Sequence, residues 1–225
     1  AACIVATGDA DAMVTGTTRN YYASLKDIKR VIAIEKEKIL FGLSIMITRT
    51  RTLFIADSTV IHTPTSEQLA DIAVQAASKA RALGHTPRVA LLSFANFGNP
   101  TMTGTERIHE AKEILNKRKV DFEYDGEMSA DVALNKELLE LYPFSGLSEP
   151  ANILIMPGLH SANIAAKLLG QVGGGQVLGP LLTGFSKPIQ IMPMGANVSE
   201  ILNYAIFAAH EVKNNKSTNK KMKAS

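Results

Sequence analysis

A capped helix followed closely by an apolar strand constrains the fold of this chain most strongly. In residues 64–84, PTSEQLADIAVQAASKARALG, Thr65 and Gln68 have the spacing of a capping box, and Gly84 suits the helix end. Apolar residues recur between them at helical spacing. The following RVALLSF, residues 88–94, is nearly continuously apolar, which is typical of a parallel strand covered on both faces.

The same alternation runs through most of the chain. Strands are expected in 39–48, 52–57, 152–158 and 187–192, and helical patterns separate most of them. This order predicts an α/β fold with a central, mostly parallel sheet flanked by helices. AACIVATG at the N-terminus is expected to be a strand entered midway in a longer protein, and the glycine-rich 173–184 a connection.

Composition excludes several classes of function. The net charge is +3, but five lysines and one acid fall within residues 211–225, so the remaining body is close to neutral. That terminus is expected to be a solvated tail, and no aromatic residues alternate with basic ones, so we expect no nucleic-acid partner. No apolar run reaches the ~18 residues of a membrane helix. A single cysteine, Cys3, favours a reducing compartment, and the cytoplasm is the expected location.

Uncharged polar side chains follow the expected strands at their carboxyl ends, where open α/β sheets bind ligands. They can hold amide, pantetheine-like or phosphate groups. The set comprises Ser93, Asn96, Asn99, Ser161 and Asn163. His160 lies at the same edge and is either an acid, base or hydrogen-bond donor or, as we favour, a partly exposed turn residue.

Other polar clusters have simpler explanations. Asp125, Glu127 and Asp131 could bind a divalent cation, but an Asp125-Gly126 turn and helix capping near Ser129 account for them and are favoured. The glycines of 170–179 match no nucleotide-binding pattern. The histidines are dispersed and have no cysteine partners, so no metal site is expected.

The segment 187–202, KPIQIMPMGANVSEIL, has the pattern of a strand, a glycine turn and a helix start, with Asn197 or Ser199 as the cap. Such a turn directs backbone N–H groups and a helix N-terminus at an anionic ligand. No Arg, His or Lys lies between Ile189 and Leu202. The segment therefore predicts either a binding site without chemistry or a site whose chemistry lies elsewhere.

Several segments in order resemble the phosphate acetyltransferases and butyryltransferases. They include DADAMVTG, PTSEQLADIA, VALLSFANFG, DGEMSADVAL, MPGLHSANIAAKLL and GPLLTGFSKPIQ, within about residues 9–210. The resemblance implies two α/β subdomains with an acyl-CoA cleft between them. The first would comprise 1–36 with 183–212 and lack its N-terminal part, the second 37–182, and 213–225 would be a basic disordered tail.

The chain departs from active relatives where their chemistry lies. They have a Ser-Arg-Gly turn with an aspartate five residues on, whereas this chain has Pro193-Met194-Gly195 and Glu200. Lys26 replaces a second arginine. Because phosphate and a developing oxyanion need fixed positive charge, Lys26, Met194 and Glu200 are expected to be vestigial, with no catalytic residue.

These departures resemble the phosphotransacetylase-like domain at the C-terminus of bacterial NADP-dependent malic enzymes. By that resemblance the chain is expected to be a non-catalytic domain that binds acetyl-CoA as an allosteric effector, with inhibition as the expected effect, and that has no tightly bound cofactor. Its partners would be upstream malic-enzyme domains and further copies of itself. The expected ligand-binding residues are Ser93, Asn96, Gly98, Asn163, Lys187, Pro193, Met194, Gly195, Asn197 and Glu200.

Two alternatives stay open. One is an active phosphate acetyltransferase that moves acetyl between CoA and phosphate, using Lys26 with Arg19, Arg107 or an arginine outside this sequence. The other is an oligomerisation domain with a vestigial cleft.

Overall fold

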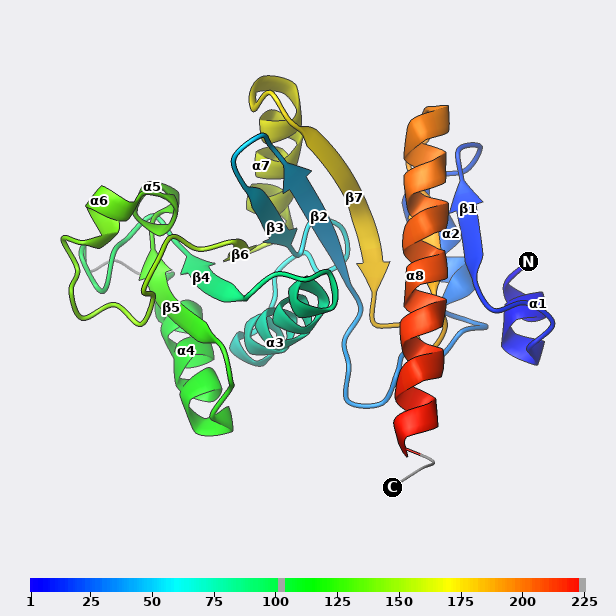
Figure 1. The fold of residues 1–225 in the computed structure, drawn as a ribbon, viewed down its shortest axis with the longest axis horizontal. Helices are drawn as coiled ribbons and strands as arrows, with labels where there is room; N and C mark the ends of the chain where they lie inside the picture. The colour runs from blue at the N-terminus through cyan, green and yellow to red at the C-terminus, as the bar shows by residue number, and fades with distance from the viewer. Residues whose placement is uncertain (101–103, 223–225) are drawn as a thin grey trace. The chain divides into compact units, whose positions relative to one another are not determined.

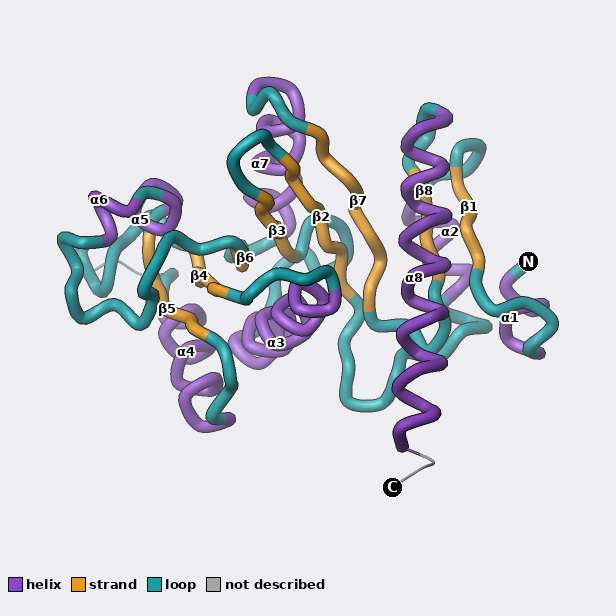
Figure 2. Tube along the Cα trace, viewed as in Figure 1, coloured by secondary structure: helices purple, strands orange, loops and turns teal. Residues whose placement is uncertain are grey.

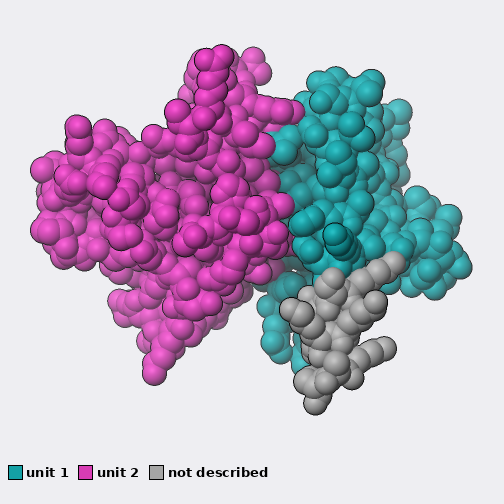
Figure 3. All heavy atoms as spheres, viewed as in Figure 1, with its two compact units in different colours: residues 1–40, 178–225 teal, residues 41–177 magenta. Residues whose placement is uncertain are grey.

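The computed structural model describes residues 1–100 and 104–222 of the 225-residue chain, with side chains as far as Asn214. Two compact units divide it (Figure 3). Unit 1 comprises Ala1–Leu40 with Leu178–Ser225, and unit 2 comprises Phe41–Val177. The subdomains expected from the sequence are 1–36 with 183–212 and 37–182.

Unit 2 is built on a twisted sheet whose strands lie side by side in the order β5-β4-β6-β3-β2 (Figures 1 and 2). Four neighbouring strands, β5, β4, β6 and β3, run parallel, and β2 pairs with β3 in the antiparallel direction. The expected α/β class with a mostly parallel sheet is confirmed. The strand bounds are β2 Phe41–Ile47, β3 Thr52–Ala56, β4 Arg88–Leu92, β5 Glu123–Met128 and β6 Ile153–Ile155.

Helices flank this sheet. The capping box of α3 is present as expected, because Thr65 accepts from the Gln68 N–H and the Gln68 side chain accepts from the Thr65 N–H. A core cluster joins Ile55, Ala90 and Leu154 to Ala162 and Ala166 of α7. The helix bounds are α3 Ser66–Ala82, α4 Glu106–Arg118, α5 Ala130–Leu134, α6 Lys136–Leu139 and α7 Leu159–Val172.

The connections diverge at the adjacent strands β3 and β6. From β3 the chain passes through α3 to β4, beyond β6, whereas α7, which follows β6, packs on β3 and β2. Adjacent parallel strands whose connections diverge leave a crevice outside their carboxyl ends, the usual ligand position in an open α/β sheet.

Unit 1 is smaller and centres on two parallel strands, β1 and β8, which pair from Met13↔Ile189 to Gly16↔Met192. The buried Gln190 side chain accepts from the Leu182 N–H and donates to the Leu182 carbonyl. The helix α8 packs against both strands. The bounds are α1 Ala2–Thr7, β1 Met13–Gly16, α2 Tyr21–Ile28, β7 Gln176–Thr183, which begins in unit 2, β8 Ile189–Met192 and α8 Val198–Met222.

Four local expectations differ from the structure. The N-terminal apolar run is the helix α1, since short apolar runs suit either state. Most of the glycine-rich 173–184 is strand β7, and Asp125-Gly126 lies inside β5 rather than in a turn. The helix α8 continues through 213–222, where a disordered tail was expected; residues 198–222 contain no Gly or Pro to stop it. Residues 223–225 lie outside the described part.

Within residues 1–100 and 104–222, none of the helices combines the length and apolarity that a membrane span requires.

Candidate functional site

The turn between β8 and α8 in unit 1 is closed by a pair of reciprocal hydrogen bonds. The Glu200 N–H donates to Asn197 Oδ1 at 3.0 Å, and the Asn197 N–H donates to Glu200 Oε2 at 2.7 Å. This is the geometry of a capping box, so Asn197 rather than Ser199 caps α8. Gly195, with a φ of 90°, supplies the left-handed residue that the turn requires.

The side chains around this turn are apolar and exposed. Met194 is 64% exposed and Val198 84%, and Leu202 is also exposed. One oxygen of Glu200 is already engaged in the cap, and residues 189–202 contain no cation. The turn therefore offers an apolar surface beside a helix N-terminus, without the fixed positive charge that phosphoryl chemistry uses.

The two lysines expected near this turn lie apart from it along the chain. Lys187 precedes β8, so the four-residue strand, about 13 Å long, separates it from Pro193. Lys26 is exposed in the last turn of α2, next to Asp27, which pairs with Arg19 at 3.0 Å.

In unit 2, the loop after β4 is held by polar contacts to the segment after β5. Asn96 Oδ1 accepts from the Ser129 N–H at 2.8 Å and from its hydroxyl at 3.0 Å. The Gly98 N–H donates to Glu127 Oε1 at 3.1 Å, and the Ala95 N–H to Ser93 Oγ at 3.4 Å. These expected ligand-binding residues thus already have partners within the protein.

The loops after β3 and β6 are tied together. Asn163 Nδ2 donates to the Ser58 carbonyl at 3.2 Å, and the Ser161 hydroxyl donates to the Gly158 carbonyl. The buried Asp57 accepts N–H groups from Gly42 and from residues 59–61. Burial raises the pKa of the Asp57 carboxyl above 3.8, although these four backbone bonds act in the opposite direction.

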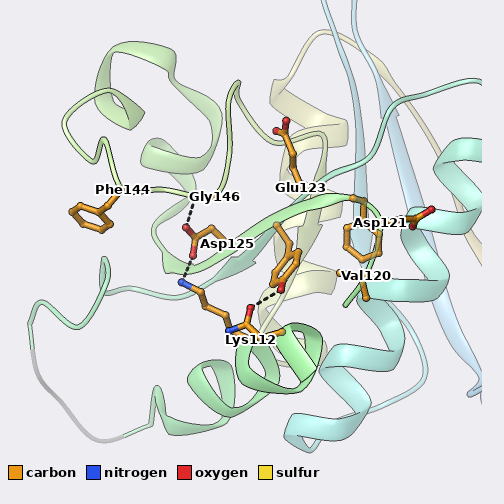
Figure 4. Close-up of a pocket in the computed structure, with 10 residues that line it drawn as sticks. Lys112, Val120, Asp121, Glu123, Asp125, Phe144 and Gly146 are labelled. Atoms are coloured by element: carbon orange, nitrogen blue, oxygen red, sulfur yellow. Dashed lines mark hydrogen bonds and ion pairs between the residues drawn. The ribbon is translucent and has the colours of Figure 1, made fainter. Parts of the chain in front are cut away.

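The three acidic residues of segment 125–131 have different surroundings. Asp125, almost fully buried, pairs with Lys112 Nζ at 2.5 Å and accepts from the Gly146 N–H, whereas Glu127 contacts His109 and Asp131 is exposed. Among the described residues, no group of three metal-binding side chains exists. Figure 4 shows Asp125 bonded to both Lys112 and Gly146. These residues line a hollow of about 600 Å³.

The structure thus places the expected ligand-binding residues in two groups, one in each unit. The turn group of unit 1 comprises Pro193, Met194, Gly195, Asn197 and Glu200; the loop group of unit 2 comprises Ser93, Asn96, Gly98 and Asn163. Sequence reasoning missed Asp57, although it is the last residue of an expected strand. It also missed that His62, judged unsupported, lies 3.0 Å from His160.

Fold and site together define an α/β protein with polar loops at the carboxyl edge of a parallel sheet and a capped turn without cationic side chains. The model of the family described as "Phosphate acetyl/butaryl transferase" matches residues 1–209, and the chain belongs to this family.

Known relatives include malic enzymes and phosphate acetyltransferases. The chain is 51% identical over 210 residues to the NADP-dependent malic enzyme of Rhizobium meliloti, covering 93% of this chain but 28% of that protein. It is 38% identical to the phosphate acetyltransferase of Treponema pallidum, covering 90% and 64%. The structure of a phosphotransacetylase from Streptococcus pyogenes superposes with a TM-score of 0.89 at 28% identity, covering 94% and 65%.

Proposed function

We propose that this chain is the phosphotransacetylase-like domain of an NADP-dependent malic enzyme, and that it binds acetyl-CoA as an allosteric effector without transferring the acetyl group. The β8–α8 turn carries the proposal. Its helix N-terminus suits an anionic ligand, and exposed Met194 and Val198 suit the apolar parts of a thioester and pantetheine arm.

The loss of transfer chemistry follows from charge. A phosphate dianion and the oxyanion that forms on the acetyl carbon need preorganised cations, and removing one such donor costs about 10²–10³ in rate. Residues 189–202 supply none, and Glu200 is engaged with Asn197. Binding tolerates this loss far better than catalysis does, because binding does not require stabilisation of a transition state.

The similarity to malic enzymes supports an NADP-dependent malic enzyme as the parent protein of this chain. Malic enzymes from R. meliloti and Salmonella typhimurium match at 51% and 37% identity, each over 93% of this chain and 28% of their own length. Because the matched region makes up only 28% of each malic enzyme, it suits a role in regulation and assembly beside the rest of that protein. We propose inhibition as the sign of the effect, homo-oligomerisation and a cytoplasmic location.

The experiment is a malate oxidation assay on the natural protein that carries this sequence, with acetyl-CoA titrated against free CoA as control. We expect a saturable fall in rate with acetyl-CoA and a weaker response to CoA. Malate oxidation rates that do not depend on acetyl-CoA, together with an unchanged oligomeric state after deletion of the domain, would contradict regulation. Loss of the oligomer on deletion, with no effect of acetyl-CoA on the rate, would indicate an oligomerisation domain.

The second candidate is an active phosphate acetyltransferase, favoured by the 38% identity to the T. pallidum enzyme and by the exposed amine of Lys26. A thiol-release assay with acetyl-CoA and phosphate separates the two functions. Robust turnover that Glu200→Gln abolishes would establish transfer. Turnover at the buffer rate, beside saturable acetyl-CoA binding, supports regulation.

A further inference from the structure

Two histidines that lie 98 residues apart in the sequence meet at the carboxyl edge of the unit 2 sheet. His62 follows β3, His160 is the second residue of α7, which follows β6, and these strands are parallel neighbours. The two Nε2 atoms are 3.0 Å apart, and the rings are nearly perpendicular, with an angle of 87°. Both side chains are exposed, so solutes reach the pair.

The backbone around the pair is held in place. The Leu159 N–H donates to the His62 carbonyl at 3.1 Å, which links the two loops at the histidines themselves. The Asn163 side chain bonds to Ser58, and Asp57 fixes the turn of residues 59–61 just before His62. The two imidazoles are therefore positioned before any ligand arrives, which lowers the entropic cost of binding.

The spacing suits a shared metal ion. Two imidazole nitrogens bound at about 2.0–2.1 Å to a tetrahedral ion lie about 3.3–3.4 Å apart. The two Nε2 atoms, 3.0 Å apart and hydrogen-bonded to each other, are a few tenths of an ångström closer than that, so an ion would replace the proton that they share. His62 Nδ1 lies 3.1 Å from the Thr63 hydroxyl. That hydroxyl can accept a hydrogen bond from the Nδ1–H group, which leaves the Nε2 lone pair of His62 available to a metal ion.

We propose that His62 and His160 form a two-imidazole site for Zn²⁺ or a similar first-row ion. Imidazole suits zinc, copper and nickel rather than magnesium or calcium. Two protein ligands leave coordination positions for water or an anion, and the N-terminus of α7 favours the anion there. The site lies where the connections of β3 and β6 diverge, and it does not depend on the proposed acetyl-CoA function.

The test is calorimetry of the chelator-treated, tag-free protein with Zn²⁺ alone. We expect one saturable site, and a Zn²⁺ affinity at least about tenfold weaker in His62→Asn and in His160→Asn. His210→Gln is the matched control, since it also removes one imidazole but lies on α8, and it is expected to bind like the wild type. Circular dichroism confirms that each variant is folded.

Histidine-selective ¹⁵N NMR gives a second readout that a change in stability would not produce. On addition of Zn²⁺, the Nε2 resonances of two histidines are expected to shift, and these shifts are expected to disappear in His62→Asn and His160→Asn. Failure to bind Zn²⁺ at millimolar concentration, or the same affinity in both variants as in the wild type, would overturn the proposal.

Discussion

The two groups of expected ligand-binding residues differ in how their polar atoms are used. In unit 2, the loop after β4 is bonded to Ser129 and to Glu127 of β5, and Asn163 of α7 is bonded to the loop after β3. In unit 1, the β8–α8 turn is closed by its own cap, and Met194 and Val198 beside it are exposed. Similar strand-to-helix turns are therefore held by side-chain hydrogen bonds in one unit, whereas in the other they present an exposed apolar surface.

The largest expected effect tests the bracing of unit 2. Lys112→Met leaves the buried Asp125 carboxylate without its cation, and breaking a buried pair costs about 3–5 kcal/mol. Because Lys112 is partly exposed, we expect the lower end, about 3 kcal/mol, in urea unfolding. The exposed Lys117→Met is the control, expected within about 0.5 kcal/mol of the wild type. Equal stability of both variants would refute a bracing role for this pair.

Asn96→Ala tests the loop after β4. It removes the acceptor of both the Ser129 N–H and hydroxyl, and we expect a loss of about 1–3 kcal/mol in the free energy of unfolding. Thermal unfolding beside the exposed control Asn99→Ala measures it. If acetyl-CoA affinity changes while stability stays constant, Asn96 contacts ligand instead of bracing the loop.

The cap of α8 is expected to matter less. Asn197→Ala removes the acceptor for the Glu200 N–H and is expected to cost about 1 kcal/mol, whereas Ser199→Ala, just inside the helix, serves as control. Glu200→Gln keeps a capping-box residue and is expected to stay close to the wild type. Denaturant titrations of the three variants check the order, and a larger loss from Ser199→Ala would show that the cap is misassigned.

Met194→Arg is expected to have the smallest effect. Met194 is exposed, so stability should change by no more than about 0.5 kcal/mol. The arginine alone is not expected to give transfer, because Lys26 stands where the resemblance to active relatives leads us to expect a second arginine, and Glu200 stays in its cap. Thiol release with acetyl-CoA and phosphate is the measurement; strong turnover would show that the turn is nearer to catalysis than proposed.

Sequence patterns predicted the parts of the fold that local chemistry determines. The capping box at Thr65 and the apolar strand 88–92 are local features, and both are present. The six-residue α1 and the strand β7 were missed because short apolar or glycine-rich runs suit more than one state until tertiary contacts select one.

The candidate site was predictable in its turns but not in its contacts. Asn197 was one of two caps that the sequence allowed, and the hydrogen bond from Glu200 selects it. The meeting of His62 and His160 depends on β3 and β6 becoming neighbours across 98 residues, which no local pattern encodes.

The central claim is that recognition of acetyl-CoA persists without acetyl transfer, and calorimetric titration of the natural protein with acetyl-CoA tests it most directly. We expect saturable heat with phosphate present, unchanged in Glu200→Gln, since that carboxylate serves the cap rather than chemistry. Absence of saturable heat at millimolar acetyl-CoA would contradict the account.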